Sequence, residues 1–346
     1  MAVYTTIDDP EAYFQAKIYT GTGSSQAQTF DGDTDMQPDM VWIKQRSGVE
    51  QHVIFDSVRG VQKYITPNTT AAEGDTATTL TAFGSDGFTE GGHGITGGSS
   101  GTYAAWCWKA NGSGSSNTDG SINTTKTSAN TTSGFSINTF TGSGSAATIG
   151  HGLGAVPTMI ISKETGGSNA WYVYHVANGN THGLRLSATD AKEDDATLWN
   201  DTTPTSSVYS VGSNTGTNDT TAMVSYVFTP KQGFSKFGSY TGNGNADNTF
   251  VYLGFKPAFV MIKRTNSTKD WYIFDNKVNP INPTAHYLEP NTSDAQGNYA
   301  WIDFLSNGFK IRNTSDGAGG SGDTYIYAAF AEAPFVNSNG VPCNAR

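Results

Sequence analysis

One motif occurs three times along this chain: an aromatic residue, then threonine, glycine, a variable residue and a second glycine. The copies begin at Tyr19, Phe140 and Tyr240. Each copy is followed by a proline, an apolar run and a lysine, at 38–44 (PDMVWIK), 157–163 (PTMIISK) and 257–263 (PAFVMIK). Recurrence of this kind predicts that the 346-residue chain contains three similar structural units in tandem.

The three copies stay aligned after the lysines Lys44, Lys163 and Lys263. Ten residues beyond each lysine a second short apolar segment begins, at 54–56 (IFD), 173–175 (VYH) and 273–275 (IFD). Aromatic runs then close the units, at 102–109, 222–228 and 324–330. The lysines are 163 − 44 = 119 and 263 − 163 = 100 residues apart, so the first unit carries an insertion.

The composition favours strands over helices. The chain has 41 glycines, many Thr, Ser and Asn residues, and only 14% charged residues, which is typical of short strands joined by polar turns. We therefore expect an all-β protein of three antiparallel β-sandwich-like units, each with its own core. The predicted boundaries are a first unit with an N-terminal docking segment (1–112), a Gly/Ser/Asn/Thr-rich linker (113–133), a second unit (134–232), a third unit (233–335) and an extended C-terminal tail (336–346).

Charge and hydropathy exclude several classes of partner. The formal net charge is −10 and no basic cluster is present, which argues against nucleic acid. There is no run of eighteen apolar residues and no signal-peptide pattern, so we expect no membrane insertion and synthesis in a cytoplasm. The two cysteines, Cys107 and Cys343, lie in different units and are expected to be free thiols.

The search for catalytic or metal-binding motifs gives only partial matches. The carboxylates of 31–35 (DGDTD) are spaced as at the start of a calcium loop, but Trp42 stands where the twelfth-position acid belongs, which favours a solvated turn. The acidic cluster 193–195 and the loop histidines His93 and His151 lack a fixed second partner. No phosphate loop, zinc signature or nucleophile motif is present. We therefore predict no catalytic residue, no cofactor and no metal.

The repeat itself also argues against an enzyme. A catalytic residue shared by three similar units would recur at matched positions, yet Asp56 and Asp275 are matched by His175. Paired acids of a glycosidase, which need not recur, stay open as a hypothesis.

Aromatic side chains are the remaining candidates for a binding role. Four tryptophans could offer flat faces to sugar rings or anchors for a protein partner: Trp171, Trp199, Trp271 and Trp301. The alternative, which we favour for most of them, is a place in the core. The loops 91–101 and 213–221 vary between the units and are the other candidate binding surface.

Several longer segments resemble a known group of proteins: 233–244 (GFSKFGSYTGNG), 255–264 (FKPAFVMIKR), 301–309 (WIDFLSNGF), 331–335 (AEAPF), 8–15 (DDPEAYFQ) and 341–346 (VPCNAR). They are similar to tandem-repeat virion structural proteins, tail-fibre-like or appendage proteins, of marine tailed bacteriophages, including cyanophages. The resemblance implies a non-enzymatic virion protein on the particle exterior that contacts capsid or tail proteins and forms a homo-oligomer. It carries over no catalytic residue.

The role within such a particle stays open at this point. Heptads and collagen-like tracts are absent, which favours a compact tail or capsid appendage over a long fibre. Host adhesion through a glycan-binding, receptor-recognition module is one alternative, and a capsid decoration or knob protein is another. A polysaccharide depolymerase ranks last.

Overall fold

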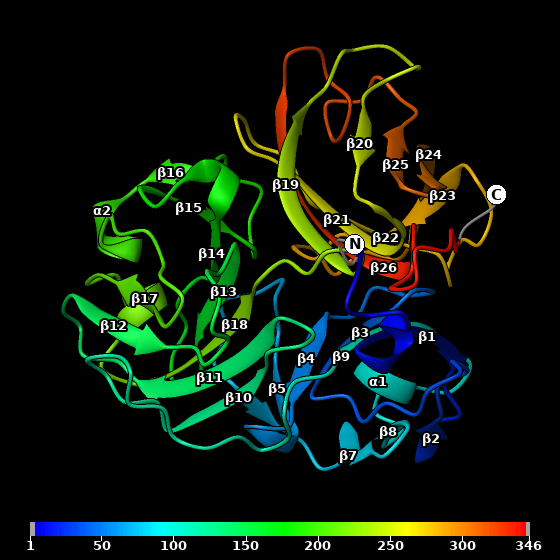
Figure 1. Cartoon of the computed structure of the whole chain (residues 1–346). Coiled ribbons are helices and arrows are strands. Elements are labelled where there is room, and N and C mark those ends of the chain that lie inside the picture. Colours follow the sequence, from blue (N-terminus) through cyan, green and yellow to red (C-terminus); the bar gives the residue numbers. More distant parts are fainter. Residues whose placement is uncertain (1–3, 344–346) are drawn as a thin grey trace.

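The computed structural model describes residues 4–343, and most of them lie in antiparallel β-sheets. Figure 1 shows the sheets grouped into three bodies around a common centre. Each body has a sheet that faces the centre, here called the first, second or third main sheet, and a second, outer sheet. The predicted all-β class is therefore confirmed, and the helices are single turns: η1 (Pro10–Ala12), α1 (Gly94–Gly97), η2 (Val176–Asn178), α2 (Ala196–Trp199) and α3 (Thr215–Asn218).

The first main sheet is built from residues near the N-terminus. Its strand order is β1 (Phe14–Thr20), β9 (Thr102–Trp108), β3 (Met40–Gln45), β4 (Val53–Asp56), β5 (Gly60–Ile65) and β6 (Gly74–Asp75). Its outer sheet has the order β2 (Gln26–Gln28), β8 (Gly87–Glu90) and β7 (Leu80–Gly84).

The second main sheet has seven strands and begins with an added edge strand. The order is β10 (Lys126–Asn130), β11 (Phe135–Thr141), β18 (Ala222–Phe228), β13 (Met159–Glu164), β14 (Tyr172–His175), β15 (His182–Arg185) and β16 (Glu193–Asp194). Its outer sheet is the pair β12 (Ala147–Gly150) and β17 (Val208–Val211).

The third main sheet comes from the C-terminal part of the chain. It has the order β19 (Ser235–Thr241), β26 (Thr324–Pro334), β21 (Phe255–Arg264) and β22 (Trp271–Asp275). Its outer sheet has the order β20 (Phe250–Tyr252), β25 (Gly308–Ile311), β24 (Gly297–Leu305) and β23 (Thr284–Tyr287).

The Pro-led apolar runs form the middle layer of each body because both of their faces are buried. In β3, Val41 and Ile43 pack toward the outer sheet, whereas Met40 and Trp42 pack toward the centre of the molecule. A strand covered on both faces needs apolar residues at successive positions, which is the pattern of these runs. The same run places Lys44 at the end of the strand, fully buried.

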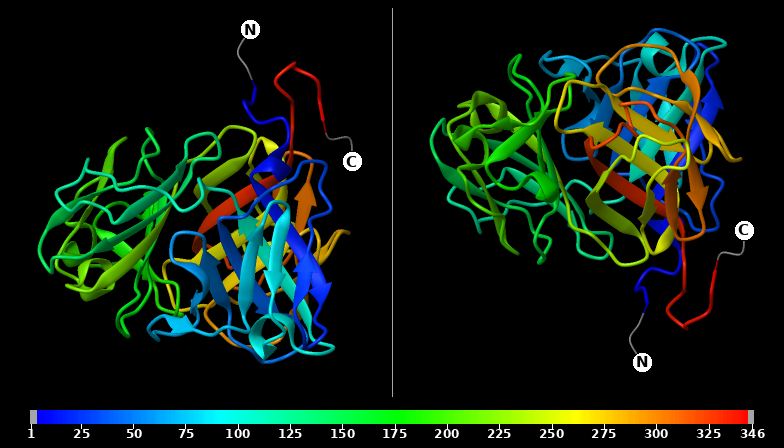
Figure 2. Two further views of the ribbon diagram at one scale, coloured as in Figure 1. Left: turned by 90° about the horizontal axis from the view of Figure 1, so that it is seen from below. Right: turned by 90° about the horizontal axis from the view of Figure 1, so that it is seen from above.

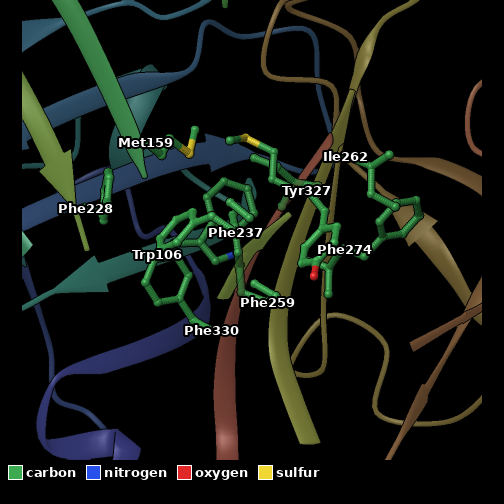
Figure 3. Close-up of a cluster of buried hydrophobic side chains, with 14 of the residues drawn as sticks. Trp106, Met159, Phe228, Phe237, Phe259, Ile262, Phe274, Tyr327 and Phe330 are labelled. Carbon is green, nitrogen blue, oxygen red and sulfur yellow. The ribbon is translucent and has the colours of Figure 1, made fainter. Parts of the chain in front are cut away.

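The inward faces of the three main sheets meet in one aromatic core (Figure 3). Phe330 of β26 lies 5.3 Å from Phe14 of β1 and 5.9 Å from Phe228 of β18, measured between ring centroids. Phe259 of β21 lies 5.7 Å from Trp108 of β9. The sheets leave an apolar cavity of only about 20 Å³ between them. The expectation that each unit buries its own core is therefore incomplete, because the largest core is shared by all three.

Two segments that the sequence analysis placed outside the three units have defined positions in the structure. The segment predicted as a linker, 113–133, contains β10, which pairs with β11 and forms the edge of the second main sheet. Near the C-terminus, Ser338 donates its backbone N–H to the Asp8 carboxylate at 2.7 Å. Figure 2 shows both ends of the chain at the same end of the molecule, here called the terminal end.

Candidate functional surfaces

The four tryptophans proposed as glycan contacts are all buried. Trp171 is 0% exposed, Trp199 and Trp271 are 1% exposed, and Trp301 is 4% exposed. A sugar ring has no access to these faces, so the contact hypothesis is wrong for these four residues and the core assignment holds. The physical reason is that two of them close the boundary between bodies: Trp171 Nε1 donates to Thr66 O at 3.0 Å and Trp271 Nε1 donates to Arg185 O at 2.9 Å.

The three repeated lysines perform the same task at the three boundaries between bodies. Each is fully buried and donates its ammonium group to a loop carbonyl of a neighbouring body. The contacts are Lys163 Nζ to Thr70 O (3.2 Å), Lys263 Nζ to Thr189 O (2.8 Å) and Lys44 Nζ to Ser293 O (3.2 Å). Burial lowers the pKa of each lysine to about 8. A loop of the first body thus accepts a hydrogen bond from the lysine of the second body. In the same way, a loop of the second body accepts from the third, and a loop of the third accepts from the first.

Backbone hydrogen bonds follow the same cycle two residues beyond each lysine. Their donors and acceptors are Glu73 N to Thr165 O (2.9 Å), Lys192 N to Thr265 O (3.0 Å) and Gln296 N to Arg46 O (2.9 Å). The three bodies therefore close into a ring in which each one contacts both of the others.

The matched positions Asp56, His175 and Asp275 also lie at these boundaries. Tyr226 Oη donates to Asp56 Oδ2 at 2.7 Å, and Trp106 Nε1 donates to Asp275 Oδ2 at 3.0 Å. His175 accepts from Ala177 N through Nδ1, which leaves the proton on Nε2 to be donated to Tyr327 O at 3.2 Å. Burial lowers the pKa of His175 to about 4 and raises the pKa of Asp275. Each of the three side chains joins main sheets of two different bodies.

The repeated glycine motif forms the turns that follow β1, β11 and β19. Gly21, Gly142 and Gly242 each donate their N–H to the segment that leads into β9, β18 or β26, at Gly101 O, Thr221 O and Asp323 O (2.8, 3.1 and 3.0 Å). A Cβ atom at Gly142 would lie 1.8 Å from Asp219 O. The candidate binding loops 91–101 and 213–221 are the partners of these turns, so part of their backbone is already engaged.

The two loop histidines accept hydrogen bonds from backbone N–H groups two residues further along the chain. His93 accepts from Ile95 N at 3.2 Å as the N-cap of α1, and His151 accepts from Leu153 N at 3.2 Å. Neither arrangement provides a base next to a nucleophile.

The acidic turn 31–35 is tied to neighbouring elements. Asp31 Oδ1 lies 3.2 Å from Lys277 Nζ, and Asp33 N donates to Glu11 Oε2 at 3.3 Å. Within residues 4–343, no group of three or more His, Cys, Asp or Glu side chains is arranged to hold a metal ion. In the same part of the chain, no helix has the length and apolar character needed to cross a membrane.

The terminal end carries exposed apolar side chains. Tyr4 is 57% exposed, Tyr252 55% and Val341 55%. Tyr4 and Tyr252 line a pocket of about 320 Å³ together with Leu253 and Phe335. This surface could not be predicted from the sequence, because its residues come from three distant segments that only the fold brings together.

Two sequence comparisons complete the description. Residues 9–334 match a family model described as a domain of unknown function, DUF7483. No curated protein matches the chain.

Proposed function

Since the chain belongs to the DUF7483 family, for which no function is known, its role has to follow from its own residues, and we propose that it is a non-enzymatic structural subunit of a tailed-phage virion. In this proposal the subunit stands on the particle exterior as a tail or capsid appendage and attaches through its terminal end.

The proposal includes a molecular architecture of three tandem copies of one β-unit. Three observations support it. The main sheets share the strand order β1-β9-β3-β4, β11-β18-β13-β14 and β19-β26-β21-β22. The lysine and backbone contacts between bodies recur around the ring, and the glycine turns make the same hydrogen bonds.

The observation that carries the structural role is the use made of the matched polar residues. In each body, the repeated lysine and the side chain twelve residues later both form hydrogen bonds with a neighbouring body. A chain whose repeated polar side chains hold its own sheets together is suited to form a rigid block. The terminal end, with exposed Tyr4 and Tyr252, then supplies the apolar anchors typical of a protein interface.

Site-specific photo-crosslinking in assembled particles tests the attachment. A photoreactive amino acid at Tyr252 should give a crosslink to another virion protein. The same amino acid at Ser99 is the matched control and should give none, because Ser99 is exposed and follows α1. The helix α1 lies at the end of the molecule opposite to the two chain termini (Figure 2). Crosslinks from Ser99 but not from Tyr252, or absence of the chain from purified particles, would overturn the proposal.

A further inference from the structure

One carboxyl group of the third body contacts two side chains whose functional groups are able to react with each other. Glu332 Oε1 forms an ion pair with Lys256 Nζ, and Glu332 Oε2 accepts a hydrogen bond from Asn276 Nδ2 at 2.8 Å. A lysine amine is a nucleophile once it has lost a proton, and the side-chain amide of asparagine has a carbonyl carbon that a nucleophile attacks. Because both groups contact the same carboxyl group, they are held side by side.

The third main sheet fixes this arrangement with three adjacent strands. Glu332 lies near the end of β26, Lys256 near the start of β21, and Asn276 directly after β22, and β21 runs between the other two strands. Asn276 N donates to Ala258 O at 2.9 Å, and Lys256 is paired with Ala333 in the register of β21 and β26. The backbone therefore holds all three side chains at the same end of one sheet.

The reacting groups are shielded from water, and the carboxyl group reaches the surface. Lys256 is 7% exposed, whereas the side chain of Glu332 is 33% exposed. All three side chains line one pocket of about 200 Å³, which leaves room for a small leaving molecule to depart. Asn276 Oδ1 has no hydrogen-bond partner within the protein, so the amide is able to turn about its Cβ–Cγ bond by giving up only its contact with Glu332.

This combination of contacts distinguishes Glu332 from the other carboxyl groups that pair with a lysine. In the part of the chain that the structure describes, lysine forms five ion pairs with carboxylates. Only in the pair of Lys256 and Glu332 does the carboxylate also accept a hydrogen bond from an asparagine side chain. The arrangement is therefore not a general consequence of the surface composition.

We propose that Lys256 and Asn276 form an isopeptide bond, with Glu332 as the group that carries the protons. The ammonium group of Lys256 passes one proton to Glu332, which gives a neutral amine and a carboxylic acid. The amide turns, the acid donates to Asn276 Oδ1, and Nζ attacks the polarised Cγ. The fixed positions of the two groups replace an encounter in solution.

The atoms and charges of this reaction balance without any further reactant. The Nζ–Cγ bond forms and the Cγ–Nδ2 bond breaks. A second proton of Nζ passes through Glu332 to Nδ2, which leaves as ammonia, and ammonia takes the first proton from Glu332 and departs as ammonium. Nothing is oxidised or reduced, and the carboxylate is restored.

The product is a covalent link within the third body. It joins β21 to the segment after β22 and closes a loop of 276 − 256 = 20 residues. A link of this kind lowers the entropy of the unfolded chain. The reaction takes place once per chain, so it agrees with a non-enzymatic role and does not depend on where the chain attaches to a particle.

Mass spectrometry of the full chain, denatured after prolonged incubation in its folded state, tests this inference. The wild-type chain should have a mass lower than that of its sequence by one ammonia molecule. Proteolysis should release the segments around Lys256 and Asn276 as one branched peptide. Glu332→Gln keeps the side-chain shape, removes the proton carrier and should have the full mass. Lys277→Arg is the matched control and should lose ammonia as the wild type does, because Lys277 lines the same pocket but pairs with Asp31.

A second variant keeps the test decisive if Glu332→Gln fails to fold. Lys256→Arg keeps the positive charge, removes the nucleophilic amine and should also have the full mass. Thermal unfolding of each variant shows whether its fold is intact. A wild-type chain of full mass, or a loss of ammonia that persists in a folded Lys256→Arg chain, would overturn the inference.

Discussion

At the scale of single residues, the same matched position forms a hydrogen bond between two bodies in all three units, each time with a different partner. Asp56, His175 and Asp275 occupy equivalent places beyond the repeated lysines, and each joins two bodies through a partner that suits its chemistry. The position requires a hydrogen-bonding group at a dry boundary and tolerates either a carboxylate or an imidazole. This explains why no acid recurs in all three units.

His175 should make the fold sensitive to acid. The pKa of His175 is about 4 in the folded chain, whereas an imidazole that is not buried has a pKa of 6.5. Between these two pH values the unfolded state therefore binds more protons than the folded state. Its contribution to stability is complete above pH 6.5 and is lost as the pH falls toward 4. His175→Gln should remove about 2 to 3 kcal/mol of the stability lost between pH 7 and 4.5.

Urea unfolding at the two pH values measures this effect. His182→Gln is the control, because His182 lies partly exposed on β15. If the wild-type chain and the His175 variant lose the same free energy of unfolding on acidification, the assignment of a buried neutral imidazole is wrong.

The tryptophans show where prediction from sequence reaches its limit at this scale. Their aromatic content and matched positions correctly favoured packing for most of them. The sequence did not indicate that Trp171 and Trp271 pack across boundaries between bodies, because the carbonyls they meet, Thr66 O and Arg185 O, lie 105 and 86 residues away.

At the scale of elements, the repeated glycine motif forms the same kind of turn in all three bodies. The motif recurs because the backbone of one segment passes against the backbone of another, leaving no room for a side chain at its first glycine. The apolar runs that follow the repeated prolines lie in β3, β13 and β21, so these strands follow from the repeated pattern. The strand β10 does not, because its sequence 126–130 (KTSAN) has no apolar alternation and is stabilised by pairing with β11.

Gly142→Ala should destabilise the second body through this close approach. The new Cβ would lie 1.8 Å from Asp219 O, and we expect a loss of about 2 to 3 kcal/mol from the forced backbone shift. Gly154→Ala is the matched control, because Gly154 has φ +67° but no atom within 4 Å of the added Cβ. That variant should lose only about 1 kcal/mol from backbone strain.

Denaturant unfolding of both variants gives the comparison. Gly142 does not adopt a positive φ, so a loss at Gly142 no larger than the loss at Gly154 would mean that the contact with Asp219 does not explain the motif.

At the scale of the whole molecule, the three bodies depend on one another through the shared core. Phe135 and Phe228 are 1% and 4% exposed, and the face that carries them is covered by the other two main sheets. Burial of an aromatic side chain stabilises a fold by about 1.5 to 3 kcal/mol, so uncovering several at once exceeds the stability of a typical domain.

The isolated segment 134–232 should therefore not fold as a stable monomer. Circular dichroism and proton NMR of this fragment should show no cooperative unfolding and poor signal dispersion. As a control, the full chain cut once within the exposed loop near Gly112 keeps all three bodies and should retain its fold. A cooperatively folded, monomeric fragment would show that each body is self-sufficient, as the sequence alone suggested.

We proposed that this ring of three bodies is a subunit of a virion. Cryo-electron microscopy of the intact particle would show whether the chain is present there and where it lies. We expect density for this chain on the outside of the head or tail, with Tyr4 and Tyr252 of the terminal end against a neighbouring virion protein and the glycine turns pointing outward. Density with the terminal end free in solvent, or particles that lack the chain, would contradict it.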